Sequence, residues 1–293
     1  PELQGVLGGH FARAQGFEKE VCQSISEHYL PSGLDSRVPK NVYSVTLSLS
    51  DKLDTLVGFF GLDLIPTGSK DPYALRRFTI ALVRLIIENK IRIKLRSIIN
   101  YSLTLYKEQG YEFDITKVLK ELNNFILDRL KNYSKEKNIR LDIIESSILS
   151  NDIDELYNGY KKAEILNRNI KKDLGQNVVG IYKRSFNILN SEIKKGQIQL
   201  SNTVDTGLFK NDFEKNLYKK IQEIKKYFLN VGKHEDFELS LKELYKFKQE
   251  VDLFFENVIV NDENQVIKKN RLELLNLLCK SFDNFFNFSK IES

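Results

Sequence analysis

Residues 211–230 read NDFEKNLYKKIQEIKKYFLN, and this stretch decides the fold class. Its apolar side chains recur every three or four residues, at Phe213, Leu217, Ile221, Ile224 and Phe228. This period places them on one face of an α-helix, with lysines and glutamates around the rest of it. No stretch of convincing length alternates apolar and polar residues, which is the pattern of a half-buried strand. The sequence therefore predicts an all-α protein.

The helical period extends outward from this segment in both directions. It predicts further helices over residues 17–30, 45–60, 73–106, 115–135, 151–173, 177–195, 236–259 and 268–289. Five prolines and fifteen glycines in 293 residues leave long stretches without a helix breaker. Gly110 interrupts the pattern, and residues 196–207 form a polar linker. We predict one domain over residues 1–105 and a second helical region over residues 106–293.

Composition excludes several classes of protein. A hydrophobic fraction of 41% is enough for a packed core, so the chain is not disordered. Its two cysteines, Cys22 and Cys279, lie far apart and belong to no CxxC pair, which excludes a zinc knuckle. No apolar run is long enough to span a bilayer, so no membrane partner is expected. The chain begins at Pro1 without a methionine, and we expect it to be a fragment of a longer protein.

Basic residues are concentrated in two blocks, although the net charge is only +5. Residues 70–107 contain nine basic and two acidic side chains, and residues 161–195 contain nine basic and three acidic ones. Such blocks favour contact with a polyanion. The alternative interpretation is a set of solvated helix faces that are rich in lysine.

Two short motifs lie in the first third of the chain. Asp51 and Asp54 stand one helical turn apart, so they form either a metal or acid–base pair or a polar helix face. Residues 66–72, PTGSKDP, contain glycine, serine and lysine but not in the order of a phosphate-binding loop. We expect Asp71 to cap a helix that begins at Pro72, because aspartate suits the cap and proline the first helical position.

Several motifs together resemble one protein family. They occur in the order PELQG (1–5), EHYLP (27–31), DKLDTLVG (51–58), PTGSKDP (66–72), ALRR (74–77), KR (183–184), NIL (187–189), VDLFFENV (251–258) and NRL (270–272). In this combination they resemble the central and C-terminal part of the β subunit of bacterial glycyl-tRNA synthetase. The resemblance spans essentially the whole chain and is weakest between residues 106 and 175.

The resemblance implies a fold, a function and a set of partners. Residues 1–105 are expected to form an HD-like helical domain, and the remainder to include a helical-bundle anticodon-binding domain. The implied enzyme is a cytoplasmic α2β2 glycine–tRNA ligase that uses ATP and Mg²⁺ at an active site on the α subunit. The fragment is then a non-catalytic part of a ligase, with no catalytic residue, no metal and no cofactor of its own. Its expected partners are tRNA(Gly) and the α subunit, and neither DNA nor a membrane.

The resemblance also implies where tRNA is bound. It places Lys183, Arg184, Asn187, Asn270 and Arg271 in the anticodon-binding domain. The basic side chains suit phosphate binding or stacking on a base, and the asparagines suit a base edge. In the alternative interpretation, the arginines form ion pairs between helices and the asparagines cap helices. A second basic surface is expected at Lys70, Arg76 and Arg77.

The HD-like segment departs from a working phosphohydrolase in one respect. Such an enzyme requires a His-Asp doublet, and no histidine of this chain is followed by aspartate. We therefore interpret the segment as a scaffold. Two alternative functions stay open: a metal-dependent phosphohydrolase that uses His28, Asp51 and Asp54, and a purely structural module that bridges α subunits.

Overall fold

The computed structural model describes residues 3–148, 153–195, 200–231, 236–283 and 285–292. Within these ranges every regular element is a helix, and the only bridge of strand type joins Thr67 to Lys70. The predicted all-α class is confirmed. In the same ranges no helix is both long enough and apolar enough to cross a bilayer.

The chain divides into two compact units. The N-terminal unit comprises residues 1–138 and 150–160, and the C-terminal unit comprises residues 139–149 and 161–293. This division lies beyond residue 105 because α6 (Ile115–Glu136) packs against α3 (Val42–Gly61) and α4 (Leu75–Glu88). The helix α8 (Leu156–Asn169) begins in the first unit and ends in the second.

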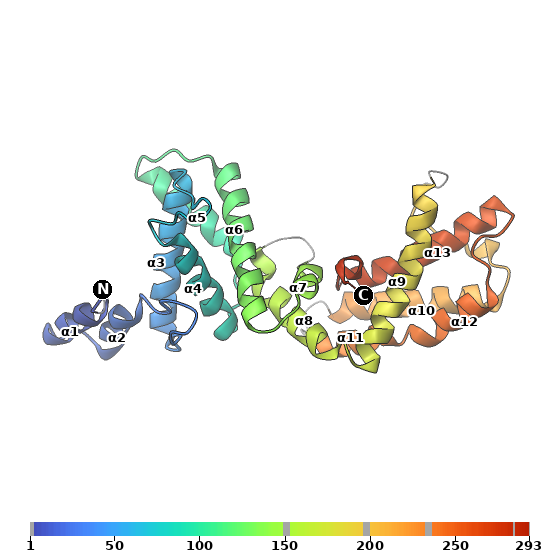
Figure 1. Cartoon of the computed structure of the whole chain (residues 1–293), viewed down its shortest axis with the longest axis horizontal. Coiled ribbons are helices and arrows are strands. Elements are labelled where there is room, and N and C mark those ends of the chain that lie inside the picture. The colour runs from blue at the N-terminus through green and yellow to red at the C-terminus, as the bar shows by residue number, and fades with distance from the viewer. Residues whose placement is uncertain (1–2, 149–152, 196–199, 232–235, 284, 293) are drawn as a thin grey trace. The chain divides into compact units, whose positions relative to one another are not determined.

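The N-terminal unit is built around α3, α4 and α6, which lie side by side (Figure 1). Two short helices, α1 (Val6–Ala14) and α2 (Lys19–Glu27), pack against each other, and α2 also packs against α3. The helix α1 was not predicted from the sequence. It approaches α2 so closely that a Cβ atom added at Gly9 would lie 1.8 Å from Ser26 Oγ.

The helical region predicted over residues 73–106 consists of two helices, α4 and then α5 (Leu95–Glu108). The break lies at Lys90, whose φ is 56°. The amide of Lys90 donates to Ile87 O at 3.1 Å and that of Ile91 donates to Ile86 O at 2.8 Å. These two bonds form a Schellman cap, which normally places glycine at the left-handed position. A lysine there gives no breaker signal in the sequence.

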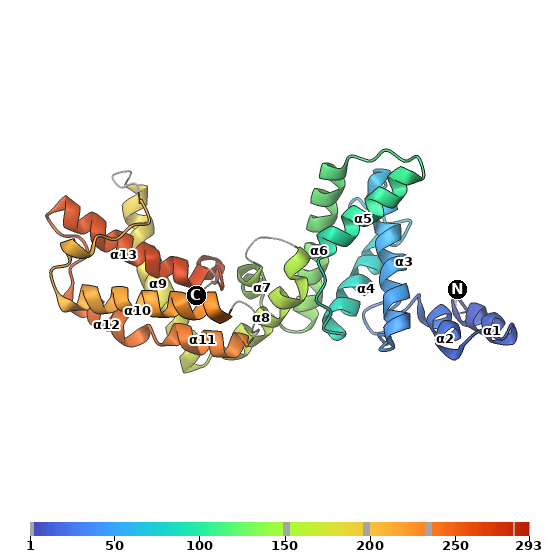
Figure 2. The same cartoon turned by 180° about the vertical axis from the view of Figure 1, so that it is seen from behind.

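The C-terminal unit packs its long helices around an aromatic core. The helix α9 (Asp173–Lys194) lies against α13 (Gln265–Asp283), and α10 (Asp212–Val231) lies against both α12 (Lys248–Asn257) and α13 (Figure 2). The fully buried aromatic side chains are Tyr182, Phe247, Phe254, Phe282, Phe286 and Phe288. The predicted helix 236–259 is divided into α11 (Phe237–Tyr245) and α12 at Lys246 and Phe247, and the buried ring of Phe247 lies 5.4 Å from that of Phe282, centroid to centroid.

The end of the described chain returns to α7 (Leu141–Ser147), which was not predicted. The short 3-10 helix η3 (Phe288–Lys290) packs on α7 and α9. The amide of Asn287 donates to Ser146 O at 2.8 Å, and that of Glu292 donates to Asp142 Oδ2 at 2.8 Å. The C-terminal unit is therefore closed by contacts between its first and its last residues.

Candidate functional site

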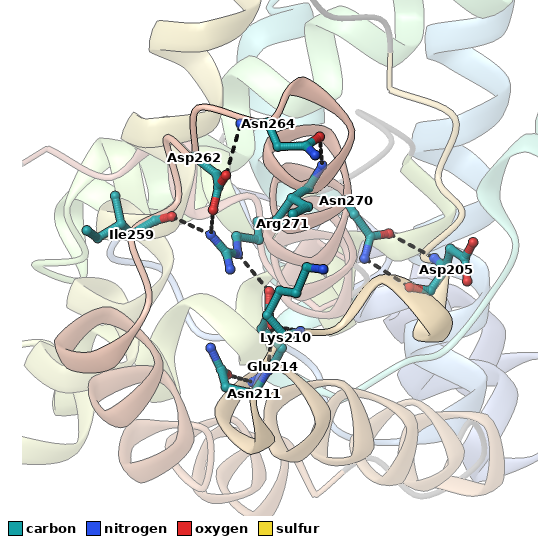
Figure 3. Close-up of polar contacts among 10 residues, drawn as sticks. Asp205, Lys210, Asn211, Glu214, Ile259, Asp262, Asn264, Asn270 and Arg271 are labelled. Atoms are coloured by element: carbon teal, nitrogen blue, oxygen red, sulfur yellow. Dashed lines mark hydrogen bonds and ion pairs between the residues drawn. The ribbon is translucent and has the colours of Figure 1, made fainter.

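Arg271 of α13 lies inside the C-terminal unit, with 7% of its side chain exposed. Its Nε donates to Glu214 Oε1 at 2.7 Å, and its Nη1 donates to Asp262 Oδ2 at 2.7 Å and to Ile259 O at 2.8 Å (Figure 3). Glu214, on α10, is only 1% exposed. The guanidinium is thus shared between two carboxylates and a carbonyl, and it joins α13 to α10 and to the segment before α13.

Asn270 and Glu273, which lie near Arg271 on α13, form hydrogen bonds with the segment that precedes α10. The side chain of Asn270 exchanges two hydrogen bonds with the backbone of Asp205, each of 2.9 Å (Figure 3). Glu273 accepts hydrogen bonds from the Ser201 amide, from Ser201 Oγ at 2.8 Å and from the Asn202 amide at 2.9 Å. We call Asn270, Arg271 and Glu273 the α13 polar cluster. It fixes residues 201–214 onto α13.

Two residues of the α13 polar cluster, Asn270 and Arg271, were predicted from the sequence to bind tRNA. Asn270 and Arg271 are each about 6% exposed, and their polar groups are engaged within the protein. Arg271 forms the ion pair between helices that the alternative interpretation describes, and Asn270 holds the linker rather than a helix end. Nε and Nη1 of Arg271 and both polar atoms of the Asn270 amide are therefore occupied within the protein. Glu273 was not singled out from the sequence, because nothing in its spacing indicates a buried carboxylate.

The other three predicted residues lie together on α9. Arg184 and Asn187 are one helical turn apart and exposed, and Lys183 is half-buried. The Arg184 guanidinium lies over the Phe255 ring of α12, with 4.2 Å between its Cζ and the ring centroid. A cation–π contact of this kind still leaves N–H donors of the guanidinium available to phosphate. Phe255 belongs to the quoted 251–258 motif, but its role beneath an arginine was not predicted.

The second predicted basic surface lies at the start of α4. Lys70 and Arg77 are exposed, whereas Arg76 is half-buried and its Nη2 donates to Gly68 O at 2.6 Å. Asp71 accepts from the Leu75 amide at 2.8 Å and from the Arg76 amide at 3.0 Å.

The capping role predicted for Asp71 is therefore seen, but the predicted helix start at Pro72 is wrong. The helix α4 begins at Leu75 because Ala74 adopts φ 57° and the Ala74 amide closes a turn onto Asp71 O at 3.1 Å. The turn carries the chain past Pro72 before the helix starts.

The residues of the hydrolase alternative do not form a metal site. The ring Nδ1 of His28 lies 2.7 Å from Ile25 O, Asp51 is half-buried and Asp54 is exposed. Across the described ranges, no group of three or more histidine, cysteine, aspartate and glutamate side chains could hold a metal ion. The buried ammonium of Lys52 donates to His28 O at 2.9 Å. No feature of the sequence indicates a buried lysine at this position.

Comparison with known proteins agrees with the division into two parts. The sequence model described as glycyl-tRNA synthetase beta subunit matches residues 1–149, which is just over half of the chain. The model described as DALR anticodon binding domain matches residues 179–293. The second match begins within α9 and extends past η3, and it includes Arg184, Asn187 and the α13 polar cluster.

Similar curated proteins carry one name. The glycine–tRNA ligase beta subunit of Cereibacter sphaeroides is 34% identical over 292 residues, which cover 100% of this chain and 42% of that protein. The glycine–tRNA ligase beta subunit of Rickettsia typhi is 33% identical over 291 residues, which cover 99% of this chain and 41% of that protein. The chain thus spans less than half the length of the curated relatives it matches.

The helical fold and the anticodon-binding match define the class, which is that of aminoacyl-tRNA synthetase components with a helical anticodon-binding domain. Within this class, the chain belongs to the glycyl-tRNA synthetase beta subunit family.

Proposed function

We propose that this chain is the tRNA-binding part of a glycyl-tRNA synthetase β subunit. In this role it supports the ATP-dependent attachment of glycine to tRNA(Gly) by a cytoplasmic α2β2 enzyme. The observation that carries the proposal is the anticodon-binding match over residues 179–293, together with the exposed arginine that it contains on α9. The α subunit supplies the active site, with ATP and Mg²⁺.

The exposed side of α9 is the proposed contact with tRNA. Arg184 contacts the Phe255 ring, so less side-chain entropy is lost when its N–H groups bind a phosphate. Lys183 adds charge beside it, and Asn187 supplies both a donor and an acceptor for a base edge. Lys70 and Arg77 of the N-terminal unit are proposed as a second contact with the RNA backbone.

Titration of tRNA(Gly) into the chain at a series of salt concentrations tests this interface. Arg184→Ala is expected to weaken binding to all tRNAs, because a phosphate contact carries no sequence information. The slope of log K against log salt should flatten by up to about one unit. Asn187→Ala should reduce the preference for tRNA(Gly) over other tRNAs with little change in slope.

Arg13→Ala provides the matched control, since Arg13 is an exposed arginine at the end of α1 in the other unit. It should leave both affinity and slope unchanged. The interface proposal fails if Arg184→Ala folds normally and binds tRNA with the affinity and slope of the parent chain.

A separate assay addresses catalysis. The chain alone is expected to form no glycyl adenylate, since the active site is assigned to the α subunit. Pyrophosphate exchange with glycine and ATP should stay at background for the pure chain and rise when an α subunit is added. Exchange well above background by the chain alone would contradict the assignment of catalysis to the partner.

A further inference from the structure

A cationic pocket lies within the N-terminal unit, apart from the proposed contact on α9. It has a volume of about 590 Å³ and lies among the end of α2, the loop that follows, α3 and the start of α4. Its lining includes Tyr29, Arg37, Lys52, Arg77 and Phe78. None of the residues that line it is acidic. A pocket that is lined by three cationic side chains and by no carboxylate attracts anions.

Lys52 is the innermost of the three cations, with 1% of its surface exposed. Its ammonium donates to His28 O at 2.9 Å and to Ser48 Oγ at 2.8 Å. An ammonium has three N–H donors, so one is left over. Within the described residues, Lys52 forms no ion pair. Burial penalises this charge more than the neighbouring Asp51 carboxylate stabilises it, and an anion that enters the pocket would offset that cost.

The two arginines differ from Lys52 in being accessible. Arg77 is exposed and has no ion-pair partner among the described residues. Arg37 gives one Nη1 contact to Glu27 Oε1 at 3.0 Å, while 70% of its side chain remains exposed. A guanidinium has five N–H donors, so each arginine has donors to spare. Their fork geometry suits a phosphate, which can accept two of these donors at once.

The pocket also contains aromatic rings on which a planar group of a ligand can stack. Tyr29 and Phe78 both line the pocket, and Lys52 Nζ lies 5.9 Å from the centroid of the Phe78 ring. Any of the nucleobases can stack on such rings, because every base has an aromatic face. The volume falls within the range of about 300–1,000 Å³ that is typical of small-molecule sites, which is more than a lone phosphate ion requires.

We propose that this pocket binds a phosphorylated ligand with a planar ring, of the nucleoside monophosphate class. The phosphate is bound by Lys52 and Arg77, and the ring lies against Tyr29 or Phe78. This proposal does not depend on the tRNA contact at α9, because it rests on residues of the other unit. It shares Arg77 with the proposed second contact with RNA, so AMP binding and not tRNA binding is the measurement that tests it.

Calorimetric titration of the chain with AMP tests the proposal. Adenosine, which lacks the phosphate, should bind at least about tenfold more weakly than AMP, and ribose 5-phosphate, which lacks the ring, should also bind more weakly. Arg77→Gln should weaken AMP binding about tenfold or more, as expected for the loss of a charge-assisted contact worth about 1.5 kcal/mol. Lys52→Met should have an effect of at least this size.

Two controls keep the result interpretable. Arg13→Gln removes an exposed arginine of the same unit that does not line the pocket, and it should bind AMP like the parent chain. Arg77 is exposed, so its replacement tests the pocket even if Lys52→Met fails to fold. Absence of AMP binding at millimolar concentration overturns the proposal, as does binding that neither Arg77→Gln nor Lys52→Met weakens. If a short RNA with a terminal phosphate competes with AMP for the pocket, the ligand is the end of an RNA chain. If it does not compete, the ligand is a free nucleotide.

Discussion

Replacement of Arg271 by methionine tests whether this residue belongs to the core or to the RNA interface. The variant keeps an unbranched chain in the same space but leaves Glu214, 1% exposed, without its cationic partner. Removal of one partner of a buried ion pair costs about 3–5 kcal/mol. The amides of Lys210 and Asn211 still donate to Glu214 Oε2, at 2.6 and 3.2 Å. We therefore expect a loss at the lower end, of about 3 kcal/mol.

This loss should appear as a change in thermal unfolding. For a unit of this size, about 3 kcal/mol corresponds to a decrease in Tm of roughly 10 °C. Circular dichroism at 222 nm follows the transition because the chain is helical. The matched control is Arg184→Met, which removes an exposed arginine of the same unit and should change stability by no more than about 0.5 kcal/mol.

A double replacement separates the ion pair from simple loss of packing. In Glu214→Gln with Arg271→Met no buried charge is left alone, so at least half of the lost stability should return. The reasoning is refuted if Arg271→Met loses less than about 1 kcal/mol while tRNA affinity and the salt slope both fall. That combination would mean that Arg271 faces the RNA and that Glu214 tolerates burial without it.

Three further replacements test features of the N-terminal unit. Asp71→Ala removes the acceptor for two amides at the start of α4 and should cost about 1 kcal/mol in urea unfolding; an unchanged midpoint would show that the cap is not needed. Gly9→Ala places a methyl group 1.8 Å from Ser26 Oγ, so it should separate α1 from α2 and cost about 1–3 kcal/mol, measured by calorimetry; a fully stable variant would contradict the close approach. Burial lowers the pKa of Lys52 from 10.5 to about 8, so the folded state binds this proton less tightly than the unfolded chain. The parent chain should therefore gain stability relative to Lys52→Met as the pH rises from about 8 to 10.5, by a total of about 3 kcal/mol. A difference that does not vary with pH over this interval would show that the ammonium is not desolvated.

The regular helices could be predicted from the sequence because their period is local. The segment 211–230 corresponds to α10 (Asp212–Val231) within a residue at each end. The breaks could not be predicted in the same way. A left-handed Lys90 ends α4 where no glycine or proline marks the sequence, and α11 and α12 are separated at Lys246 and Phe247, where no breaker stands either. Such features depend on tertiary packing rather than on composition.

The same contrast between local sequence pattern and tertiary packing applies to the candidate site. Arg184 and Arg271 have the same side chain and both lie on helices, yet the first is exposed on an aromatic ring and the second is buried against carboxylates. The difference arises from Glu214, which lies 57 residues before Arg271 in the sequence. Spacing within one helix does not reveal a partner on another. Lys52 was missed for the same reason, since lysine is seldom buried and only the fold places it inside.

The return of the C-terminal residues to α7 has a consequence for the order of events during synthesis. Asp142 meets the Glu292 amide 150 positions later, so α7 leaves the ribosome well before the residues that complete its packing. At roughly 5–20 residues per second, that interval lasts roughly 8–30 s, far longer than helix formation requires. For that time Ile143 and Ile144, both fully buried in the finished protein, lack the η3 segment that packs on their helix. The nascent chain thus exposes an incomplete apolar surface on α7 until the residues of η3 have been synthesised.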